Sequence, residues 1–351
     1  MQPTHPGPKW PIVGHDWAVR LLAKAVATGQ VHHAYLFTGP EQVGKTTLAR
    51  LFAQALHCQA DATKRPCGVC DPCQRIAREA HPDVRLITPQ GKAGSPARGG
   101  GEILIEQVRG LIHEAVLSPL SGRHKVFLVR EVDRASAPAM NALLKTLEEP
   151  PPAVVIVLTS SHPERLLPTI ISRCQVLPLR PVAAHEIEAM LRARGIEAER
   201  ATVLARLADG RPGWAMMAST DAGAWQARGE WLGDLNRLLG QGRRERLLYA
   251  ERLATHPEGA VQALALWASW WRDLLLWQQG CTQAIVHLDR REDLQTQAER
   301  LSPTQVRDFI ERLVAAREQL EQNVNARLVL ESLLLHLPRL EEMAPQQEGK
   351  G

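Results

Sequence analysis

The feature that most constrains the fold is a loop with the spacing G-x-x-x-x-G-K-[ST], in which Gly39, Gly44, Lys45 and Thr46 occupy the defined positions. A short apolar stretch precedes the loop, and apolar residues at helical spacing follow it. In this context the glycines let the backbone wrap round an anion, while amides of the loop and helix start point into it. The lysine would reach the β- and γ-phosphates, and the threonine hydroxyl would ligate Mg²⁺. The sequence therefore predicts an ATP and Mg²⁺ pocket.

All nine residues of the loop and the helix start are expected to contact the nucleotide. They are Gly39, Pro40, Glu41, Gln42, Val43, Gly44, Lys45, Thr46 and Thr47. The alternative, a glycine-rich turn before a helix without any ligand, is disfavoured by the intact order of strand, loop and helix.

Length and composition set broad limits. A chain of 351 residues is long enough for two or three domains. Its apolar runs, such as 153–158, are too short to span a bilayer, and the first nine residues lack the apolar core of a signal peptide. We expect a cytoplasmic protein without membrane contact. The net charge of +4 permits contact with nucleic acid but does not predict it.

Four of the six cysteines lie close together in the spacing C-x₈-C-x₂-C-x₂-C; they are Cys58, Cys67, Cys70 and Cys73. Thiolates are soft ligands, and four at short spacing suit a closed tetrahedral Zn²⁺ site with a structural role. Unligated surface thiols are one alternative. A redox pair is another, although a redox C-x-x-C motif needs no further cysteines.

The first 180 residues alternate between strand and helix patterns. Expected strands cover 34–38, 83–88, 125–133, 153–158 and 175–179, and helical periodicity marks 12–30, 45–56, 105–115, 138–147 and 163–171. The segment 91–101 reads as a loop. Such alternation predicts an α/β domain with a parallel sheet and the phosphate loop at the carboxyl end of one strand.

The end of the third expected strand departs from the pattern of a hydrolase. An Asp-Glu pair normally stands there, the first residue for Mg²⁺ and the second for the attacking water. Here Arg130 takes the place of the aspartate and Glu131 follows it, as a degraded form of the pair. Asp133 comes two residues later, where we expect its carboxylate to be misdirected. The sequence predicts nucleotide binding more firmly than hydrolysis.

After residue 181 the pattern becomes helical. Short helices separated by a break at 210–213 fill 183–219, and only helical periodicity remains beyond 223. A wide apolar stripe with four tryptophans between 264 and 277 predicts a helix-bundle core or a subunit contact. The last apolar helix covers 327–337, and a polar tail follows. We expect domains at 1–180, 181–220 and 221–340, and a disordered tail at 341–351.

These features together resemble the AAA+ clamp-loader subunits of bacterial DNA polymerase III. The matching segments besides the phosphate loop and cysteine module are His33-Ala-Tyr-Leu-Phe-Thr-Gly39, Asn141-Ala-Leu-Leu-Lys-Thr-Leu-Glu-Glu-Pro-Pro151 and Ser172-Arg-Cys174. The resemblance is dense from about 10 to 215 and thinner to about 340. It implies a helical lid, a helical collar that assembles into an open pentamer, and a role in loading the sliding clamp onto primed DNA. Implied partners are gamma/tau-like and delta subunits, the clamp and primer-template DNA.

The resemblance also assigns a role to Arg173 as an arginine finger reaching the ATP of a neighbouring motor subunit. A surface ion pair at a helix end is the plain alternative. Two departures indicate the stator type of subunit rather than the motor: Arg130-Glu131, and Gly213 where motor subunits carry a lid arginine. Arg211 stands two residues early. We therefore expect weak or absent intrinsic turnover and no polymerase active site.

Two other functions remain open. One is a gamma/tau-like motor with its own ATPase activity. The other is a zinc-containing, nucleic-acid-binding AAA+ ATPase unrelated to clamps.

Overall fold

The computed structural model describes residues 10–90, 101–322 and 324–340. Residues 91–100 of the loop expected at 91–101, the polar tail and the first nine residues lie outside them. The chain divides into two compact units. The first contains the residues up to Met190 together with Ala208–Trp214, and the second contains Leu191–Leu207 and the residues from Ala215 onward. The expected lid segment, 181–220, is thus shared between the two units.

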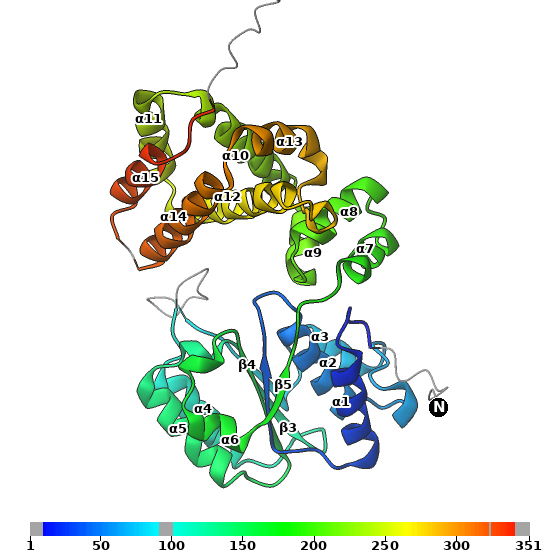
Figure 1. The fold of residues 1–351 in the computed structure, drawn as a ribbon. Helices are drawn as coiled ribbons and strands as arrows, with labels where there is room; N and C mark the ends of the chain where they lie inside the picture. Colours follow the sequence, from blue (N-terminus) through cyan, green and yellow to red (C-terminus); the bar gives the residue numbers. More distant parts are fainter. Residues whose placement is uncertain (1–9, 91–100, 323, 341–351) are drawn as a thin grey trace, which may run out of the picture. The chain divides into compact units, whose positions relative to one another are not determined.

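The first unit is built on a parallel five-stranded sheet in the order β2-β3-β4-β1-β5 (Figure 1). Its strands are β1 (Ala34–Thr38), β2 (Val84–Ile87), β3 (Lys125–Val129), β4 (Val154–Ser160) and β5 (Gln175–Pro178). The prediction of an α/β domain with a parallel sheet is confirmed. Consecutive strands of a parallel sheet need crossover helices, and the chain supplies them between the strands.

Helices cover both faces of this sheet. One face packs against α1 (Asp16–Thr28), α2 (Lys45–His57) and α3 (Asp71–Ala77); the other packs against α4 (Ile105–Ala115), α5 (Ala137–Glu148) and α6 (Pro168–Arg173). Side chains alternate accordingly along β1: Tyr35 and Phe37 join the first core, and Ala34 and Leu36 join the second. Strand β4 is buried along its whole length, as expected for a central strand.

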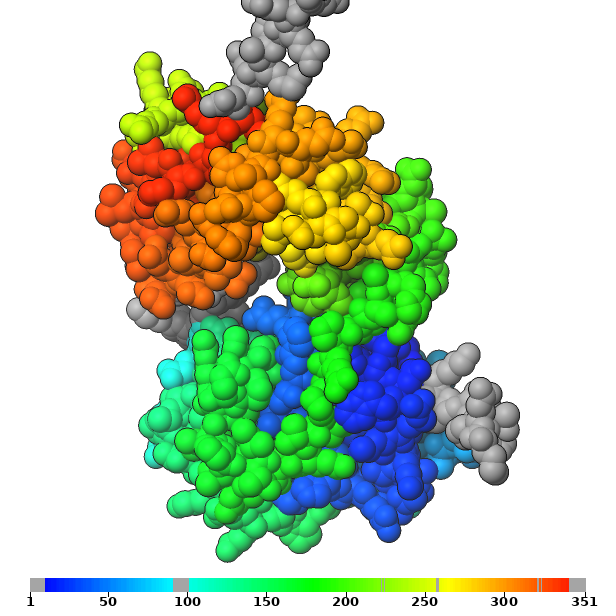
Figure 2. Space-filling model, in the orientation of Figure 1, coloured from blue at the N-terminus to red at the C-terminus, as the bar shows by residue number. Residues whose placement is uncertain are grey.

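Short elements and α7 complete this unit. They are η1 (Ala62–Lys64), η2 (Val132–Arg134), η3 (Pro163–Arg165) and α7 (Ala184–Ala193), the last of which continues into the second unit. In the space-filling view, residues from the first 60 (blue) and from about 140–180 (green) share the visible face of the unit (Figure 2). Segments far apart in the sequence therefore meet at its surface.

The expected third strand was too long. It ends at Val129 rather than Asp133, because Glu131 adopts a left-handed backbone conformation (φ 51°) and starts the 3₁₀ turn η2. Strand β4, in contrast, extends two residues beyond the expected end. Both differences change which side chains stand at the carboxyl edge of the sheet.

The second unit is helical throughout the residues described in it. Its elements are α8 (Ala198–Leu207), α9 (Pro212–Thr220), α10 (Ala222–Gly240), α11 (Arg243–Ala254), α12 (Pro257–Gln278), η4 (Thr282–Ala284), η5 (Leu288–Arg290), α13 (Arg291–Arg300), α14 (Pro303–Glu321) and α15 (Ala326–Leu335). The start of α9 belongs to the first unit.

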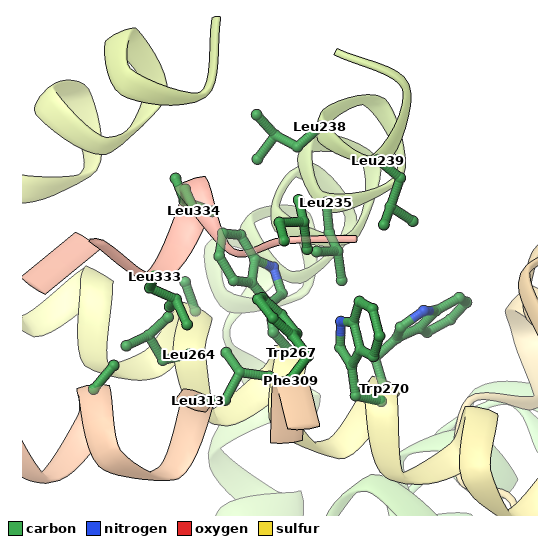
Figure 3. Close-up of a cluster of buried hydrophobic side chains, with 14 of the residues drawn as sticks. Leu235, Leu238, Leu239, Leu264, Trp267, Trp270, Phe309, Leu313, Leu333 and Leu334 are labelled. Atoms are coloured by element: carbon green, nitrogen blue, oxygen red, sulfur yellow. The ribbon is translucent and has the colours of Figure 1, made fainter. Parts of the chain in front are cut away.

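The tryptophan stripe of α12 forms the centre of this unit, and the prediction of a bundle core is confirmed. Trp267 and Trp271 are fully buried, and Trp270 is almost so. Trp271 packs on Phe309 of α14 with ring centroids 4.5 Å apart. Figure 3 shows the surrounding leucines converging on these rings from α10, α14 and α15. None of the described helices is long and apolar enough to cross a membrane.

Candidate nucleotide and metal sites

The phosphate loop connects the end of β1 to the start of α2. Gly39 has φ +138° and Gly44 has φ +117°, a range that side chains strongly disfavour. A Cβ atom on Gly39 would also lie 2.2 Å from the carbonyl oxygen of Leu179. Both motif glycines are therefore required by the backbone path. Gln42 also has a positive φ, of 60°, and the His15 ring holds the Val43 carbonyl at 3.0 Å.

The Lys45 side chain lies buried inside this loop. Its Nζ donates to the carbonyls of Gly39 (2.6 Å) and Pro40 (2.7 Å) and to the Ser161 hydroxyl (2.9 Å). These three acceptors use all three protons of the ammonium group. Burial lowers the pKa of Lys45 to about 8, although nearby carboxylates, Glu41 first, oppose the shift. A bound phosphate would replace these neutral acceptors with a charged one.

Glu131 is engaged by arginines on both sides. Its Oε1 accepts from Arg130 Nη2 at 3.2 Å, and its Oε2 accepts from Arg134 Nη1 at 3.1 Å. The Glu131 amide donates to the Thr159 hydroxyl, which fixes the turn against β4. Both carboxylate oxygens of Glu131 are thus occupied by guanidinium groups and are not free to accept a hydrogen bond from an attacking water.

Asp133 lies closer to the phosphate loop than expected. It is buried, and its Oδ1 accepts from the Ser161 amide at 3.2 Å, while the Ser161 hydroxyl accepts from Lys45. Ser161 therefore joins the carboxylate to the loop lysine. We did not identify Ser161 from the sequence; its position directly after a fully buried strand was the available signal, since parallel strands end at one edge.

The segment Ala208–Trp214 contacts the same loop. The Gly213 amide donates to the Gln42 carbonyl at 2.9 Å, and the Gly210 carbonyl accepts from the Val182 amide. Arg211 does not extend to the loop in place of a lid arginine, because its Nε donates to the Ala208 carbonyl at 2.9 Å. The hydrogen bond between this segment and the phosphate loop is therefore made by the backbone of Gly213.

Arg173 is the last residue of α6. Its Nη2 lies 2.8 Å from Glu148 Oε1, and its Nη1 donates to the Thr169 carbonyl at 3.1 Å. The side chain is about one-third exposed. The plain alternative of a surface ion pair is thus present in this chain, and the role in trans stays a prediction.

The structure brings the four cysteines of the module together. All four Sγ atoms lie within 4.8 Å of one another, and those of Cys58 and Cys70 are 3.9 Å apart. Amides of Cys67 and Cys70 donate to the sulfurs of Cys58 and Cys67. The Cys70 and Val69 amides lower the pKa of Cys67 to about 6. None of the six cysteines forms a disulfide.

This sulfur arrangement fits a tetrahedral zinc ion. With Zn–S bonds of about 2.3 Å, the sulfurs of such a site are about 3.8 Å apart. The Cys58–Cys70 distance of 3.9 Å is close to that value. Cys58 directly follows α2 and Cys73 lies in α3, and the Gln54 side chain of α2 joins the two helices by donating to the Cys73 carbonyl at 2.7 Å.

An open hollow of about 370 Å³ lies along Glu79–Leu86, on the turn between α3 and β2. Its lining residues do not belong to the phosphate loop or the cysteine module, and we assign it no ligand.

The sheet order, the phosphate loop and the following helical unit define a P-loop domain of the AAA+ class. The family described as "DNA polymerase III, delta subunit" matches residues 14–183, and the one described as "DNA polymerase III, delta subunit, C terminal" matches residues 222–339. The chain is 29% identical to the delta-prime subunit of Bacillus subtilis DNA polymerase III, across 91% of this chain and 94% of that one. The chain belongs to the delta-prime family of DNA polymerase III subunits.

Two further proteins are similar, one over a shorter stretch of the chain and one at lower identity. The tau subunit of Escherichia coli DNA polymerase III is 37% identical over 205 residues, which are 57% of this chain and 30% of that protein. The chain therefore matches less than a third of the length of that relative. A solved structure of a DNA polymerase III gamma subunit-related protein from Thermotoga maritima is 17% identical, with a TM-score of 0.40 over 91% of this chain and 99% of that one.

Proposed function

We propose that this chain is the stator subunit of the DNA polymerase III clamp loader. It would act in the cytoplasm within a hetero-oligomer of gamma/tau and delta subunits that loads the sliding clamp onto primer-template DNA. Membership of the delta-prime family supports this role. Any polymerase activity belongs to the holoenzyme that contains the loader.

The arginine pairing of Glu131 is the observation that carries the stator assignment. A motor subunit needs a carboxylate free to polarise water and another to hold Mg²⁺. In this chain both Glu131 oxygens accept from Arg130 and Arg134, and a guanidinium stands at the metal-ligand position. The phosphate loop remains intact, so the chain would bind ATP with Mg²⁺ and turn it over slowly or not at all.

The proposed contribution to catalysis is Arg173 acting in trans. The side chain is about one-third exposed, and three of its N–H groups are used within the chain, by Glu148, Thr169 and Ser172. A guanidinium has five donors, so two remain for a phosphoryl group of a neighbour. Such a charge supplied in trans stabilises the transition state of phosphoryl transfer by a large factor.

The cysteine module would hold one structural Zn²⁺. Cys58, Cys67, Cys70 and Cys73 would supply four thiolates, a donor set that leaves no open position for chemistry. Bound zinc would hold the loop between α2 and α3 in a single conformation. The proposal rests on the sulfur distances given above.

Reconstitution with the other loader subunits tests the proposal. We expect Arg173→Ala to join the complex and to lower clamp- and DNA-stimulated ATPase at least about tenfold, given the size of arginine-finger effects. Lys45→Ala should have a smaller effect on that rate. Unchanged ATPase in the Arg173 variant would reject the finger.

The two alternatives predict different results. A gamma/tau-like motor would hydrolyse ATP as a purified single chain, and Lys45→Ala would abolish that turnover. A clamp-unrelated ATPase would fail to co-elute with loader subunits in size exclusion and would bind DNA tightly alone. Loader contacts with DNA run through phosphates and should weaken steeply with salt.

A further inference from the structure

We infer that Glu148 is a positioning residue for Arg173: the carboxylate orients the guanidinium for its phosphoryl partner. The inference rests on the proposed function, since it concerns the same arginine. It adds a second residue to the site and a specific mechanical role for it.

The two residues close two adjacent helices. Glu148 is the last residue of α5, and Arg173 is the last residue of α6. Their neighbours Leu147 and Ile170 are almost fully buried in the core on one face of the sheet. The backbone at both helix ends is therefore held by packing, while the two side chains meet at the rim. The ion pair therefore joins two helix ends whose backbones are held in place.

Acceptors on both terminal nitrogens orient the planar guanidinium group of Arg173. Arg173 Nη2 contacts Glu148 Oε1 at 2.8 Å, and Nη1 donates to the Thr169 carbonyl at 3.1 Å. Nη1 also donates to the Ser172 hydroxyl at 3.5 Å, and acceptors on both terminal nitrogens restrict rotation of the guanidinium plane. The remaining N–H groups then point in a defined direction before the partner arrives, which removes part of the ordering that binding would otherwise require.

The ion pair between Glu148 and Arg173 contributes little to the stability of the fold. Its side chains are 34% and 47% exposed, and ion pairs of this exposure contribute little to stability because water screens them. Loss of Glu148 should therefore leave the fold intact and change the arginine's orientation. That separation makes the inference testable by kinetics.

The adjacent Glu149 offers a matched control. It carries the same charge one residue later, and among the described residues its carboxylate makes no hydrogen bond or ion pair. Its amide donates to the Lys145 carbonyl, so its backbone is anchored like that of Glu148. Any effect of net charge alone should appear equally in both variants.

The experiment compares Glu148→Ala, Glu148→Gln, Glu149→Gln and Arg173→Ala in the reconstituted loader with clamp and primed DNA. We expect Glu148→Ala to lower kcat for ATP about three- to tenfold with KM changed less than twofold, and Glu148→Gln to fall between it and the unmodified chain. Glu149→Gln should match the unmodified chain. The double variant Glu148→Ala/Arg173→Ala should be no slower than Arg173→Ala alone, because both act through one group.

The outcomes separate the two proposals. If Arg173→Ala lowers kcat and Glu148→Ala behaves like Glu149→Gln, the positioning role is rejected and the finger stands. A higher kcat in Glu148→Ala would also reject it, because the carboxylate would then restrain the arginine. If Arg173→Ala itself leaves kcat unchanged, the proposed function fails and the inference fails with it. Thermal melting of each variant within about 2 °C of the unmodified chain excludes misfolding as the cause.

Discussion

The Gly213 amide donates a hydrogen bond of 2.9 Å to the Gln42 carbonyl and so joins the segment Ala208–Trp214 to the phosphate loop. The two backbones approach so closely that a Cβ on Gly213 would lie 2.9 Å from that oxygen. Gln42 has a positive φ, so its carbonyl direction is set by the conformation of the loop. Glycine at position 213 thus permits a close backbone contact that the Cβ atom of an arginine would obstruct.

We predict that Gly213→Ala destabilises the chain by about 1 kcal/mol. Overpacking against backbone costs about 1–3 kcal/mol, and the better helix propensity of alanine near the start of α9 offsets part of it. Gly229→Ala in α10 is the control: nothing lies within 4 Å of its added methyl group, so it should stabilise by about 0.5–1 kcal/mol. Denaturant unfolding measures both. Shifts of the same sign would contradict the close contact.

The affinity for ATP should depend on pH through Lys45. Its pKa of about 8 lies below the ordinary value because burial disfavours the ammonium. The anion binds the protonated form, so affinity should be constant below pH 7 and fall up to about tenfold per unit above pH 8. Lys45→Arg keeps its charge and should bind independently of pH between 7 and 9.5. Titration calorimetry at stepped pH decides; a flat profile for the unmodified chain would disprove the assignment.

Zinc should be present at one ion per chain. Cys70→Ser should lose the ion and loosen the loop between α2 and α3, because metal binding and local folding are linked. The exposed Cys281 lies outside the module, and Cys281→Ser should retain full zinc. Elemental analysis and limited proteolysis measure both effects. A zinc-free chain that resists proteolysis as well as the unmodified one would count against the site.

Asp83 should be a strong stability determinant. Its buried carboxylate accepts from the amides of Leu120, Ser121 and Gly122 and from the Ser121 hydroxyl. Burial alone would raise its pKa, but these bonds outweigh it and lower the pKa. Asp83→Asn should cost about 2–4 kcal/mol, since an amide donor would face these donors. The exposed Asp16 is the control, and Asp16→Asn should cost less than about 1 kcal/mol.

The contribution of Asp83 to stability should depend on pH. A carboxylate whose folded pKa is depressed contributes stability above its unfolded pKa, which is about 3.9, and loses that contribution as pH falls through the folded value. The stability difference between the unmodified chain and Asp83→Asn should therefore shrink below about pH 4. Unfolding curves at pH 7, 5 and 3 test this, and a constant difference would refute it.

Local sequence patterns determined much of the fold and of the candidate sites of this protein. Alternating apolar stretches of strand and helix length predicted the parallel sheet, since periodicity reports which side chains a core must cover. The phosphate loop and the cysteine spacing were readable because their chemistry depends on residues a few positions apart. The spacing of the tryptophan stripe of α12 likewise predicted a bundle core or a subunit contact, and the structure places the stripe in a core.

Only the tertiary structure decided which of the charged and polar side chains contact one another. Asp133 reaches Lys45 through Ser161, Glu131 is held between two arginines, and Glu148 contacts Arg173. Most of these contacts join residues 25 or more positions apart, where strand register and turn geometry, not local propensity, set the distance. The third strand also ended early because a left-handed residue turned the chain. The sequence therefore identified the phosphate loop and the cysteines, and the fold determined which carboxylates and arginines contact each other.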